Sequence, residues 1–286
     1  MYSNCDYFFD SSGNIYLVRG YLHPPGSVYA KMIYQKDEAG TRLDNFGNHY
    51  IKQQLDDGLL ISKDSIVSYF KPRQATILKS LSGIWKNIYN SLLNSGVAKE
   101  DIGVFGSALV NFPVIRDVDF IVYGVDNCQL IRRQINKIKS DLGFTDISPD
   151  HIKYQAQKFG ASHNLAATNF EKTLSNKWST MQIVPGISNT IVFGYREEEV
   201  TSELDASDRP GREIIITGIV LDDLYSNFVP RIFKISSAGQ IYTIKTLFWA
   251  YHGCVLTGQR VKITGKLVDD KVILINDFNH GIWLED

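Results

Sequence analysis

The sequence predicts an α+β protein in which a mixed sheet with helices is followed by a small β-barrel. Three observations support this fold class. Aromatic and β-branched runs open the chain, helical and strand-like periodicities alternate in its middle, and five short strand-like runs close it. We therefore expect a β-rich N-terminal element over 1–62, a core with a mixed sheet over 63–200, and a barrel over 201–286.

The composition is that of an ordinary globular protein, with 44% hydrophobic and 21% charged residues among 286. The net charge of -1 excludes a strongly cationic nucleic-acid coat but allows a local basic groove. The three cysteines of the chain are far apart and show neither a disulfide framework nor zinc-ligand spacing. No apolar run approaches the ~20 residues of a membrane helix, and the first residues do not resemble a signal peptide. We expect a cytoplasmic protein without membrane contact.

The N-terminal element is predicted to consist of strands. Two aromatic, β-branched runs flank the turn formed by residues 11–14, Ser-Ser-Gly-Asn, which is typical of a hairpin. The sequence His-Pro-Pro-Gly at 23–26 forms a rigid break, after which Val28–Tyr34 is predicted to be a third strand.

The middle of the chain alternates between helical and strand-like patterns. Apolar residues at helical spacing over 64–97, interrupted by Pro72, predict two helices. The later elements are expected at strands 102–105 and 118–123, helices 126–142, 149–159 and 164–176, and a strand pair at 178–184 and 190–195. This order indicates a sheet layered with helices.

The C-terminal part is predicted to be a barrel that follows a charged linker over 196–211. Its five strands are expected at 213–221, 231–236, 240–246, 259–268 and 271–278. Two of them, "EIIITGIVLDD" and "RVKITGKLVDD", share an internal Thr-Gly that is typical of a barrel corner. The simplest arrangement is an OB-like barrel, whose aromatic and basic residues either contact single-stranded nucleic acid or fill the barrel interior.

Two aspartates, Asp117 and Asp119, stand where an apolar strand begins, in the sequence "DVDFIVYG". Residues i and i+2 of a strand face the same side, so the two carboxylates would repel unless a cation separated them. Mg²⁺ or Mn²⁺ shared with substrate phosphates fits such hard oxygen ligands. Upstream, Gly106 and Ser107 follow another apolar strand and would let a phosphate approach the backbone. Each feature alone is typical of a turn or a solvated edge, but their combination in an apolar context favours a metal-dependent phosphoryl-transfer site.

The segment "VFGS", a nine-residue spacer and "DVDF" resembles the nucleotidyltransferase superfamily, whose fold is shared by polymerase β, CCA-adding enzymes and small antibiotic nucleotidyltransferases. More narrowly, "DIGVFGSAL", "RDVDFIVYG" and the N-terminal "GYLHPPGSVYAKMIY" look like archaeal-type predicted nucleotidyltransferases. The resemblance implies a nucleotidyltransferase-like core, an NTP bound through Gly106 and Ser107, and Mg²⁺ or Mn²⁺ held by Asp117 and Asp119 as the catalytic pair.

Members of this superfamily usually carry a third carboxylate on a later strand. Here that strand is expected at 178–186, where Thr180 or Gln182 would face the metals and neither can act as a base. Three glutamates at 197–199 could substitute, although their context favours a solvated charge run. Arg116 and Lys177 are the candidate cations for the triphosphate.

Three hypotheses follow from the sequence. The first is an enzyme that moves an NMP from an NTP to a hydroxyl acceptor, which could lie on RNA or DNA. The second, motivated by the absent third carboxylate, is a catalytically degenerate protein of the same fold that binds nucleotide or nucleic acid. The third is a purely structural adaptor. The sequence identifies neither the acceptor nor the preferred base nor the oligomeric state.

Overall fold

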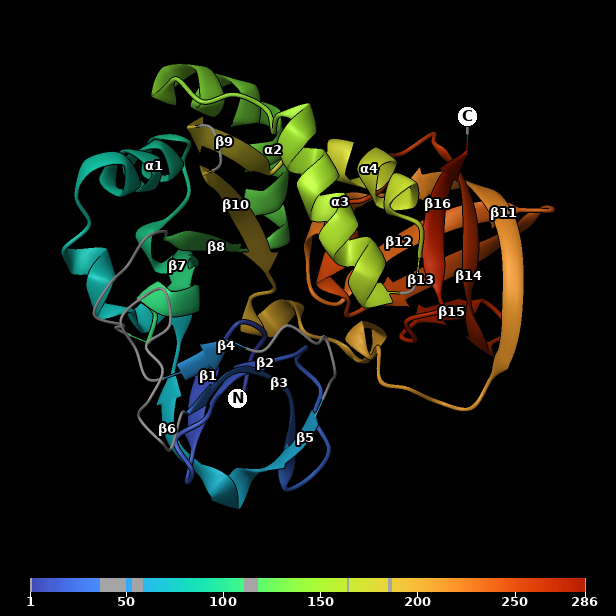
Figure 1. The fold of residues 1–286 in the computed structure, drawn as a ribbon, viewed down its shortest axis with the longest axis horizontal. Coiled ribbons are helices and arrows are strands. Elements are labelled where there is room, and N and C mark those ends of the chain that lie inside the picture. Colours follow the sequence, from blue (N-terminus) through green and yellow to red (C-terminus); the bar gives the residue numbers. More distant parts are fainter. Residues whose placement is uncertain are drawn as a thin grey trace. The chain divides into compact units, whose positions relative to one another are not determined.

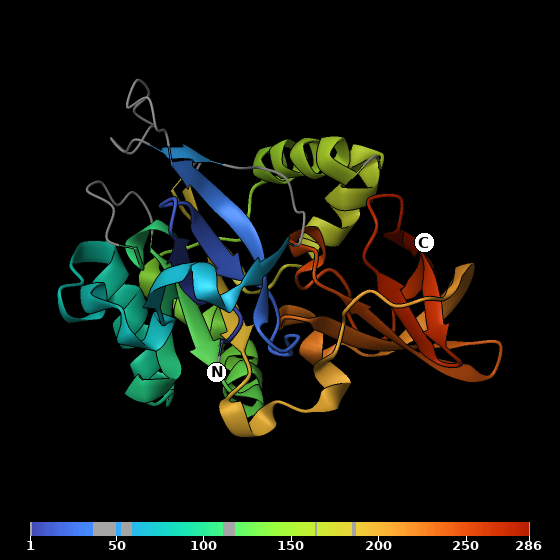
Figure 2. The ribbon, with the colours of Figure 1, turned by 90° about the horizontal axis from the view of Figure 1, so that it is seen from below.

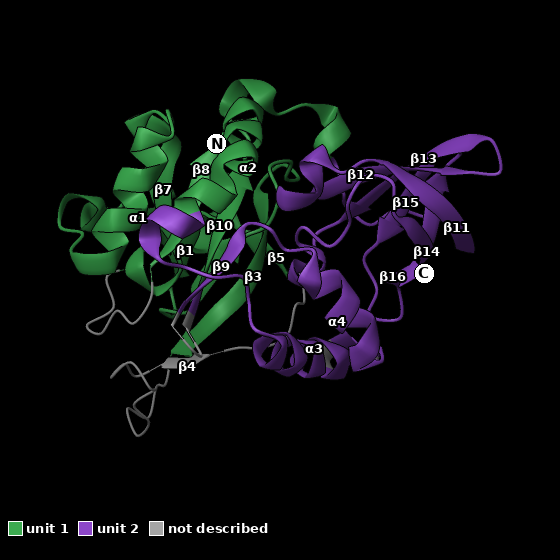
Figure 3. Cartoon of the chain, turned by 90° about the horizontal axis from the view of Figure 1, so that it is seen from above, with its two compact units in different colours: residues 1–138, 189–204 green, residues 139–188, 205–286 purple. Residues whose placement is uncertain are grey.

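The computed structural model describes residues 2–36, 50–52, 59–110, 118–163, 165–184 and 187–285, and its fold is mixed α+β (Figure 1). The chain forms two compact units (Figure 3). The first comprises residues 1–138 and 189–204, and the second comprises residues 139–188 and 205–286. The expected N-terminal element therefore joins the first part of the core in one unit, while the later core helices join the barrel in the other.

An antiparallel sheet opens the first unit, with the order β4-β3-β2-β1-β6 and β5 paired to β3. Its strands are β1 (Tyr7–Asp10), β2 (Ile15–Val18), β3 (Ser27–Lys36), β4 (Tyr50–Lys52), β5 (Leu59–Ser62) and β6 (Ile66–Phe70). Figure 2 shows β3 as a long blue strand of this sheet. The predicted hairpin is confirmed, because the Asp10 carboxylate accepts hydrogen bonds from the amides of Ser12 and Asn14 at 2.9 and 2.8 Å.

The first of the two helices predicted over 64–97 is wrong, since Ile66–Phe70 is the strand β6. β6 pairs with β1, and this non-local pairing overrides the helical spacing of its apolar residues. The second predicted helix is confirmed as α1 (Gly83–Asn94), which buries Ile88 and Leu92.

A mixed sheet lies at the centre of the first unit. Within this unit it contains β7 (Ile102–Phe105), β8 (Asp119–Tyr123) and β10 (Ile187–Gly194), three of the four strands in the order β7-β8-β10-β9, and α2 (Val125–Leu142) follows β8. β7 runs antiparallel to β8, whereas β10 runs parallel to it. β7 is buried along its whole length, which explains why its four residues are apolar or glycine.

The second unit contains two helices, a strand and a closed five-stranded barrel. These elements are α3 (Pro149–His163), α4 (Ala167–Ser175), β9 (Thr180–Val184), β11 (Arg212–Asp222), β12 (Arg231–Ser237), β13 (Gln240–Thr246), β14 (Arg260–Asp269), β15 (Val272–Ile275) and β16 (Gly281–Glu285). The barrel order is β11-β12-β13-β15-β14, closed by the pairing of β14 with β11, and β16 extends it beside β14. β13 and β15 are parallel.

The two similar Thr-Gly strands are neighbours in this barrel, β11 and β14. A Cβ at Gly218 would lie 2.5 Å from the carbonyl oxygen of Ser236, and one at Gly265 would lie 2.7 Å from that of Leu274. The missing side chains therefore let the strands cross closely at barrel corners, as the sequence pattern predicts. Phe170 and Leu174 of α4 pack into the same hydrophobic core as the barrel interior. Within the described ranges, no helix combines the length and the apolar character that crossing a bilayer requires.

Candidate functional site

The Gly106–Ser107 bend lies directly beside Asp119. β7 and β8 are paired so that Phe105 stands opposite Asp119, and the chain then turns at Gly106 with φ +75°. A Cβ on Gly106 would lie 3.1 Å from Oδ2 of Asp119. A residue with a side chain would strain this left-handed backbone and would displace the carboxylate by a few tenths of an ångström. The structure thus brings together two of the predicted features, the bend and one aspartate.

Ser107 lies in the middle of a short 3-10 turn, Gly106–Ala108, that is closed by a hydrogen bond from the Leu109 amide to the Gly106 carbonyl at 3.1 Å. Ser107 is 7% exposed and Ala108 is fully buried, so the turn is fixed by packing on both sides of the bend. Asp119 is only partly buried. Carboxylate oxygens are ligands that hard cations such as Mg²⁺ prefer.

Tyr7 of β1 joins this site, and the sequence pattern gave no sign of it. Its side chain is 3% exposed, and the phenol takes part in a hydrogen bond with the backbone of Gly106. Burial raises the pKa of Tyr7, and the nearby charges of Tyr34, Cys5 and Asp119 raise it further, while the hydrogen bond to Gly106 opposes the shift. Tyr7 is therefore a neutral hydrogen-bonding group that holds the bend from the N-terminal sheet.

Two of the predicted residues, Asp117 and Arg116, lie outside the described residues. Of the predicted carboxylate pair, the structure therefore places Asp119 alone. Among the residues that the structure describes, no three histidine, cysteine, aspartate or glutamate side chains are grouped closely enough to hold a metal ion.

The strand beside β8 is β10, whereas the sequence predicted that 178–186 would occupy this place. Ile191 pairs with Phe120, so one residue earlier Thr190 stands level with Asp119. The position at which the resemblance would place a third carboxylate is thus occupied by Thr190, whose hydroxyl cannot act as a base at neutral pH. Two strands, β9 and β10, follow the helices, and it is the second of them, β10, that pairs with β8. Local periodicity does not encode this strand order.

Thr180, Gln182 and Lys177 all belong to the second unit. The side chain of Gln182 accepts a hydrogen bond from the Ser148 amide at 2.8 Å, and its backbone pairs with Thr145. Thr180 is buried on the same strand, β9. These contacts give Gln182 a structural role inside its own unit.

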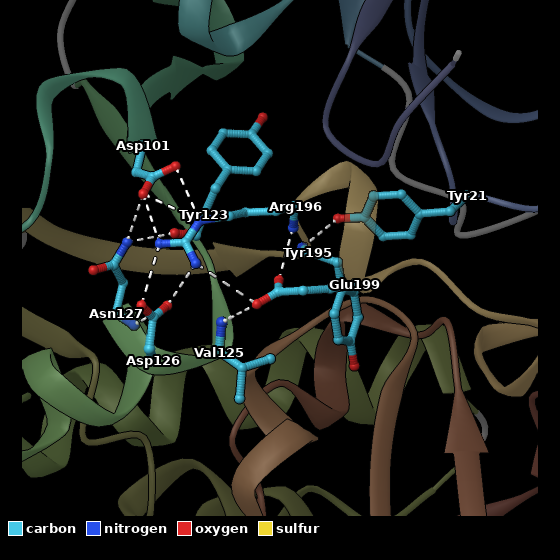
Figure 4. A network of polar contacts seen from close by, with 9 residues as sticks. All are labelled: Tyr21, Asp101, Tyr123, Val125, Asp126, Asn127, Tyr195, Arg196 and Glu199. Carbon is cyan, nitrogen blue, oxygen red and sulfur yellow. Dashed lines mark hydrogen bonds and ion pairs between the residues drawn. The ribbon is translucent and has the colours of Figure 1, made fainter.

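The acidic run after β10 is folded into the first unit (Figure 4). Glu199 accepts hydrogen bonds from the amides of Val125 at 3.0 Å and Arg196 at 2.8 Å, and it thereby caps the first residue of α2. The guanidinium of Arg196 binds the carboxylates of Asp101 at 2.7 Å and Asp126 at 2.9 Å. Glu199 is therefore engaged in holding a helix end, which argues against its use as a substitute third carboxylate.

Several aromatic and basic residues of the barrel are buried. Those less than 10% exposed include Phe228, Arg231, Phe233, Lys245, Phe248 and Tyr251. Phe233, Phe248 and Tyr251 belong to the hydrophobic core of the barrel, so core filling holds for these three rings. A groove of about 910 Å³ remains at the barrel surface, where Arg212, Tyr242 and Lys271 are among its lining residues.

Comparisons of the chain with protein-family models, with curated proteins and with solved structures yield no match.

Proposed function

We propose that the first unit binds a nucleoside triphosphate with Mg²⁺ or Mn²⁺ and transfers its nucleotidyl group to a hydroxyl acceptor. The observation that carries this proposal is the 3.1 Å separation between the Cβ position of Gly106 and Oδ2 of Asp119. It means that an anion resting on the Gly106–Ser107 bend and a cation bound by Asp119 would be immediate neighbours. Phosphate oxygens shared between a glycine-rich turn and a metal-binding carboxylate are the common elements of phosphoryl-transfer sites.

The carboxylate of Asp119 is a hard oxygen ligand of the kind that Mg²⁺ prefers. Asp117, two residues earlier, is the expected second ligand. When bound, the cation would neutralise polyphosphate charge. The residues of the chain hold the substrate: the Ser107 hydroxyl donates to a phosphate oxygen, and Tyr7 fixes the peptide of Gly106.

The reaction is a displacement at the α-phosphorus. The acceptor oxygen bonds to the α-phosphorus while the bond to the bridging oxygen of the β-phosphate breaks, and pyrophosphate leaves with that electron pair. The hydroxyl proton passes to water, because Thr190 occupies the position where a carboxylate base would stand. This predicts slow transfer that rises with pH as the acceptor hydroxyl becomes easier to ionise.

The acceptor is proposed to be a nucleic acid contacted by the second unit. The strand order β11-β12-β13-β15-β14 and the parallel β13–β15 pair support an OB-like barrel, a class that binds oligonucleotides. The groove lined by Arg212, Tyr242 and Lys271 offers two cations and an aromatic ring for a single strand, and Asp269 and Asp270 line it as well.

The second candidate function is a degenerate member of the same fold that binds nucleotide or nucleic acid without turnover. Thr190 at the level of Asp119 favours it, since a third carboxylate is absent from that position. Binding of NTP without transfer of label would support this candidate over the enzyme.

The experiment that separates these functions is incubation with each α-labelled NTP, Mg²⁺ or Mn²⁺, and total RNA, with label measured separately in protein and nucleic acid. The enzyme hypothesis predicts metal-dependent label in one fraction, lost in Asp119→Asn and kept in Asp64→Asn, a variant of an exposed aspartate in the same unit. Equal labelling by Asp119→Asn and the parent protein would contradict it.

A further inference from the structure

The outer face of the barrel carries a row of exposed aliphatic side chains. Three of them follow one another along β11, and a fourth lies two strands away on β13. The exposed fractions are 69% for Ile215, 40% for Ile219, 43% for Leu221 and 52% for Ile241. Ile219 pairs with Ser236, and Ser236 pairs with Ile241, so these side chains stand side by side on one face of the sheet. We call the four aliphatic residues the β11 face.

β11 is apolar on both of its sides. Its inward residues Ile216 and Val220 belong to the hydrophobic core of the barrel, while Ile215 and Ile219 point outward. Outward positions of an antiparallel sheet are normally polar, as Lys234 is on the neighbouring β12. A strand that is apolar on both sides is typical of a sheet covered on both faces. The β11 face therefore has the character of a surface that another element covers.

Exposed lysines flank the β11 face on the two neighbouring strands. Lys262 of β14 stands opposite Thr217, in the middle of the aliphatic row, and Lys234 of β12 stands opposite Asp222 at its end. The ammonium of Lys262 lies 5.9 Å from the centroid of the Trp283 ring. Among the ion pairs of the described residues, neither lysine has a carboxylate partner.

The carboxylates of β11 and β16 are already engaged. Glu285 accepts a hydrogen bond from Arg260 at 3.1 Å, and Glu213 lies 2.8 Å from Nε2 of His280. Asp222 accepts a hydrogen bond from a backbone amide at 3.0 Å. The charge available beside the aliphatic row is therefore positive, and it is complementary to a partner with acidic groups.

The partner must contact the β11 face through side chains. Backbone pairing with β11 is excluded, because β11 is hydrogen-bonded to β12 along one edge and to β14 along the other (Figure 1). A helix packed on a sheet makes the required kind of contact. Six residue steps separate Ile215 from Leu221, which makes the row about 20 Å long. A helix of about 13 residues spans that length.

We infer that the β11 face is a docking site for an acidic amphipathic helix of a protein partner. The apolar stripe of the helix covers the aliphatic row, and its carboxylates meet Lys234 and Lys262 on either side. Single-stranded nucleic acid fits this face less well, because it is bound mainly by stacking of its bases on aromatic rings. The inference goes beyond nucleotidyl transfer, since the β11 face contains no residue of the Gly106 bend. Of its four residues, Ile241 also lines the barrel groove.

The test is a selection on the full-length protein from a display library of peptides of about 15 residues. Apolar residues occupy positions i, i+3, i+4 and i+7, and the other positions vary among Glu, Lys, Gln and Ala. Selected peptides are synthesised, labelled and titrated by fluorescence anisotropy at low and high salt. Ile215→Asp places a charge in the row, and a double variant, Lys234→Glu with Lys262→Glu, reverses the flanking charge. Val67→Asp is the matched control, because Val67 is also 69% exposed but belongs to the first unit.

The expected result is enrichment of glutamate over lysine among the selected peptides, with binding that weakens as salt rises. Binding should be about tenfold or more weaker in Ile215→Asp and in the double lysine variant, and unchanged in Val67→Asp. Circular dichroism checks that each variant is folded, and the double lysine variant tests the inference independently of the aliphatic row.

Four outcomes would overturn the inference: no enriched peptide, enrichment of lysine-rich peptides, equal binding by the parent and the double lysine variant, or equal binding by the parent and Ile215→Asp. Single-stranded oligothymidine and sedimentation of the protein alone form two parallel arms. If oligothymidine binding or self-association is lost in Ile215→Asp while no acidic peptide binds the parent, the face belongs to nucleic acid or to a second copy, and the inference is wrong.

Discussion

Replacement of Gly106 by alanine probes the contact on which the proposed site depends. Gly106 has φ +75°, a conformation that costs an L-residue about 1–2 kcal/mol. The new methyl group would stand 3.1 Å from Oδ2 of Asp119, so the carboxylate must move by a few tenths of an ångström. We expect the free energy of unfolding to fall by about 1 kcal/mol, since alanine also restricts the unfolded chain.

The displacement should affect binding more than stability. A carboxylate pushed away from the bend no longer presents its oxygen where the cation and the phosphate meet, and small misplacements of such groups reduce activity by an order of magnitude or more. We expect Gly106→Ala to weaken Mg²⁺-dependent NTP binding at least tenfold. Binding is measured by calorimetry, and stability by urea unfolding followed by circular dichroism.

The matched control is Gly83→Ala in the same unit. Gly83 also has a positive φ, +54°, but a Cβ there has no atom within 4 Å. It should lose a similar amount of stability and retain NTP binding. If Gly106→Ala binds as tightly as the parent, or if Gly83→Ala loses binding to the same degree, the effect cannot arise from the Asp119 contact and the reasoning fails.

Three further predictions concern stability. Lys177→Met should stabilise the protein at pH 7, because a pKa lowered from 10.5 to about 7 corresponds to a burial penalty of up to about 5 kcal/mol. That gain in stability is largest below pH 7 and vanishes as the pH rises towards 10.5. Urea unfolding of Lys177→Met and the parent at pH 7 and pH 10 measures the gain, and a loss of stability at pH 7 would contradict the prediction. Asp6 is buried and hydrogen-bonded to Tyr69, and burial raises its pKa from 3.8 to about 7. Between these two values the folded protein binds the proton more tightly than the unfolded chain, so the stability of the parent should fall as the pH rises from 4 to 7. Asp6→Asn should remove most of that pH dependence, and an unchanged slope would refute the assignment. Arg196→Gln should cost about 3 kcal/mol, because the mostly buried carboxylate of Asp101 loses its ion-pair partner and keeps the hydrogen bond from the Asn127 amide. An unfolding midpoint equal to that of the parent would show that the network contributes little.

Local patterns in the sequence were sufficient to predict most elements of the fold. The helices α2, α3 and α4 and the five barrel strands lie close to their predicted ranges, since each has a strong periodicity and clear turn residues at its ends. Ile66–Phe70 was not predicted correctly, because its partner β1 is distant in the sequence and pairing decided its conformation.

The candidate site was predicted in part for a related reason. Gly106 and Asp119 follow from motif chemistry on adjacent strands, and they lie together in the structure. Tyr7 reaches the bend from the N-terminal sheet, and no local signal links residues so far apart. Glu199 likewise looked like part of a solvated run, yet it caps α2 through an amide 74 positions earlier in the chain.

The central claim is that Asp119 holds a divalent cation against a polyphosphate seated on the Gly106–Ser107 bend. Its most direct test is a Mn²⁺ titration followed by electron paramagnetic resonance, with and without a non-hydrolysable NTP analogue, in the parent protein, Asp119→Asn and Asp64→Asn. The account predicts Mn²⁺ binding that depends on the analogue in the parent and in Asp64→Asn, and that is lost in Asp119→Asn. Equal Mn²⁺ binding by all three proteins, or none by the parent in the presence of the analogue, would contradict it.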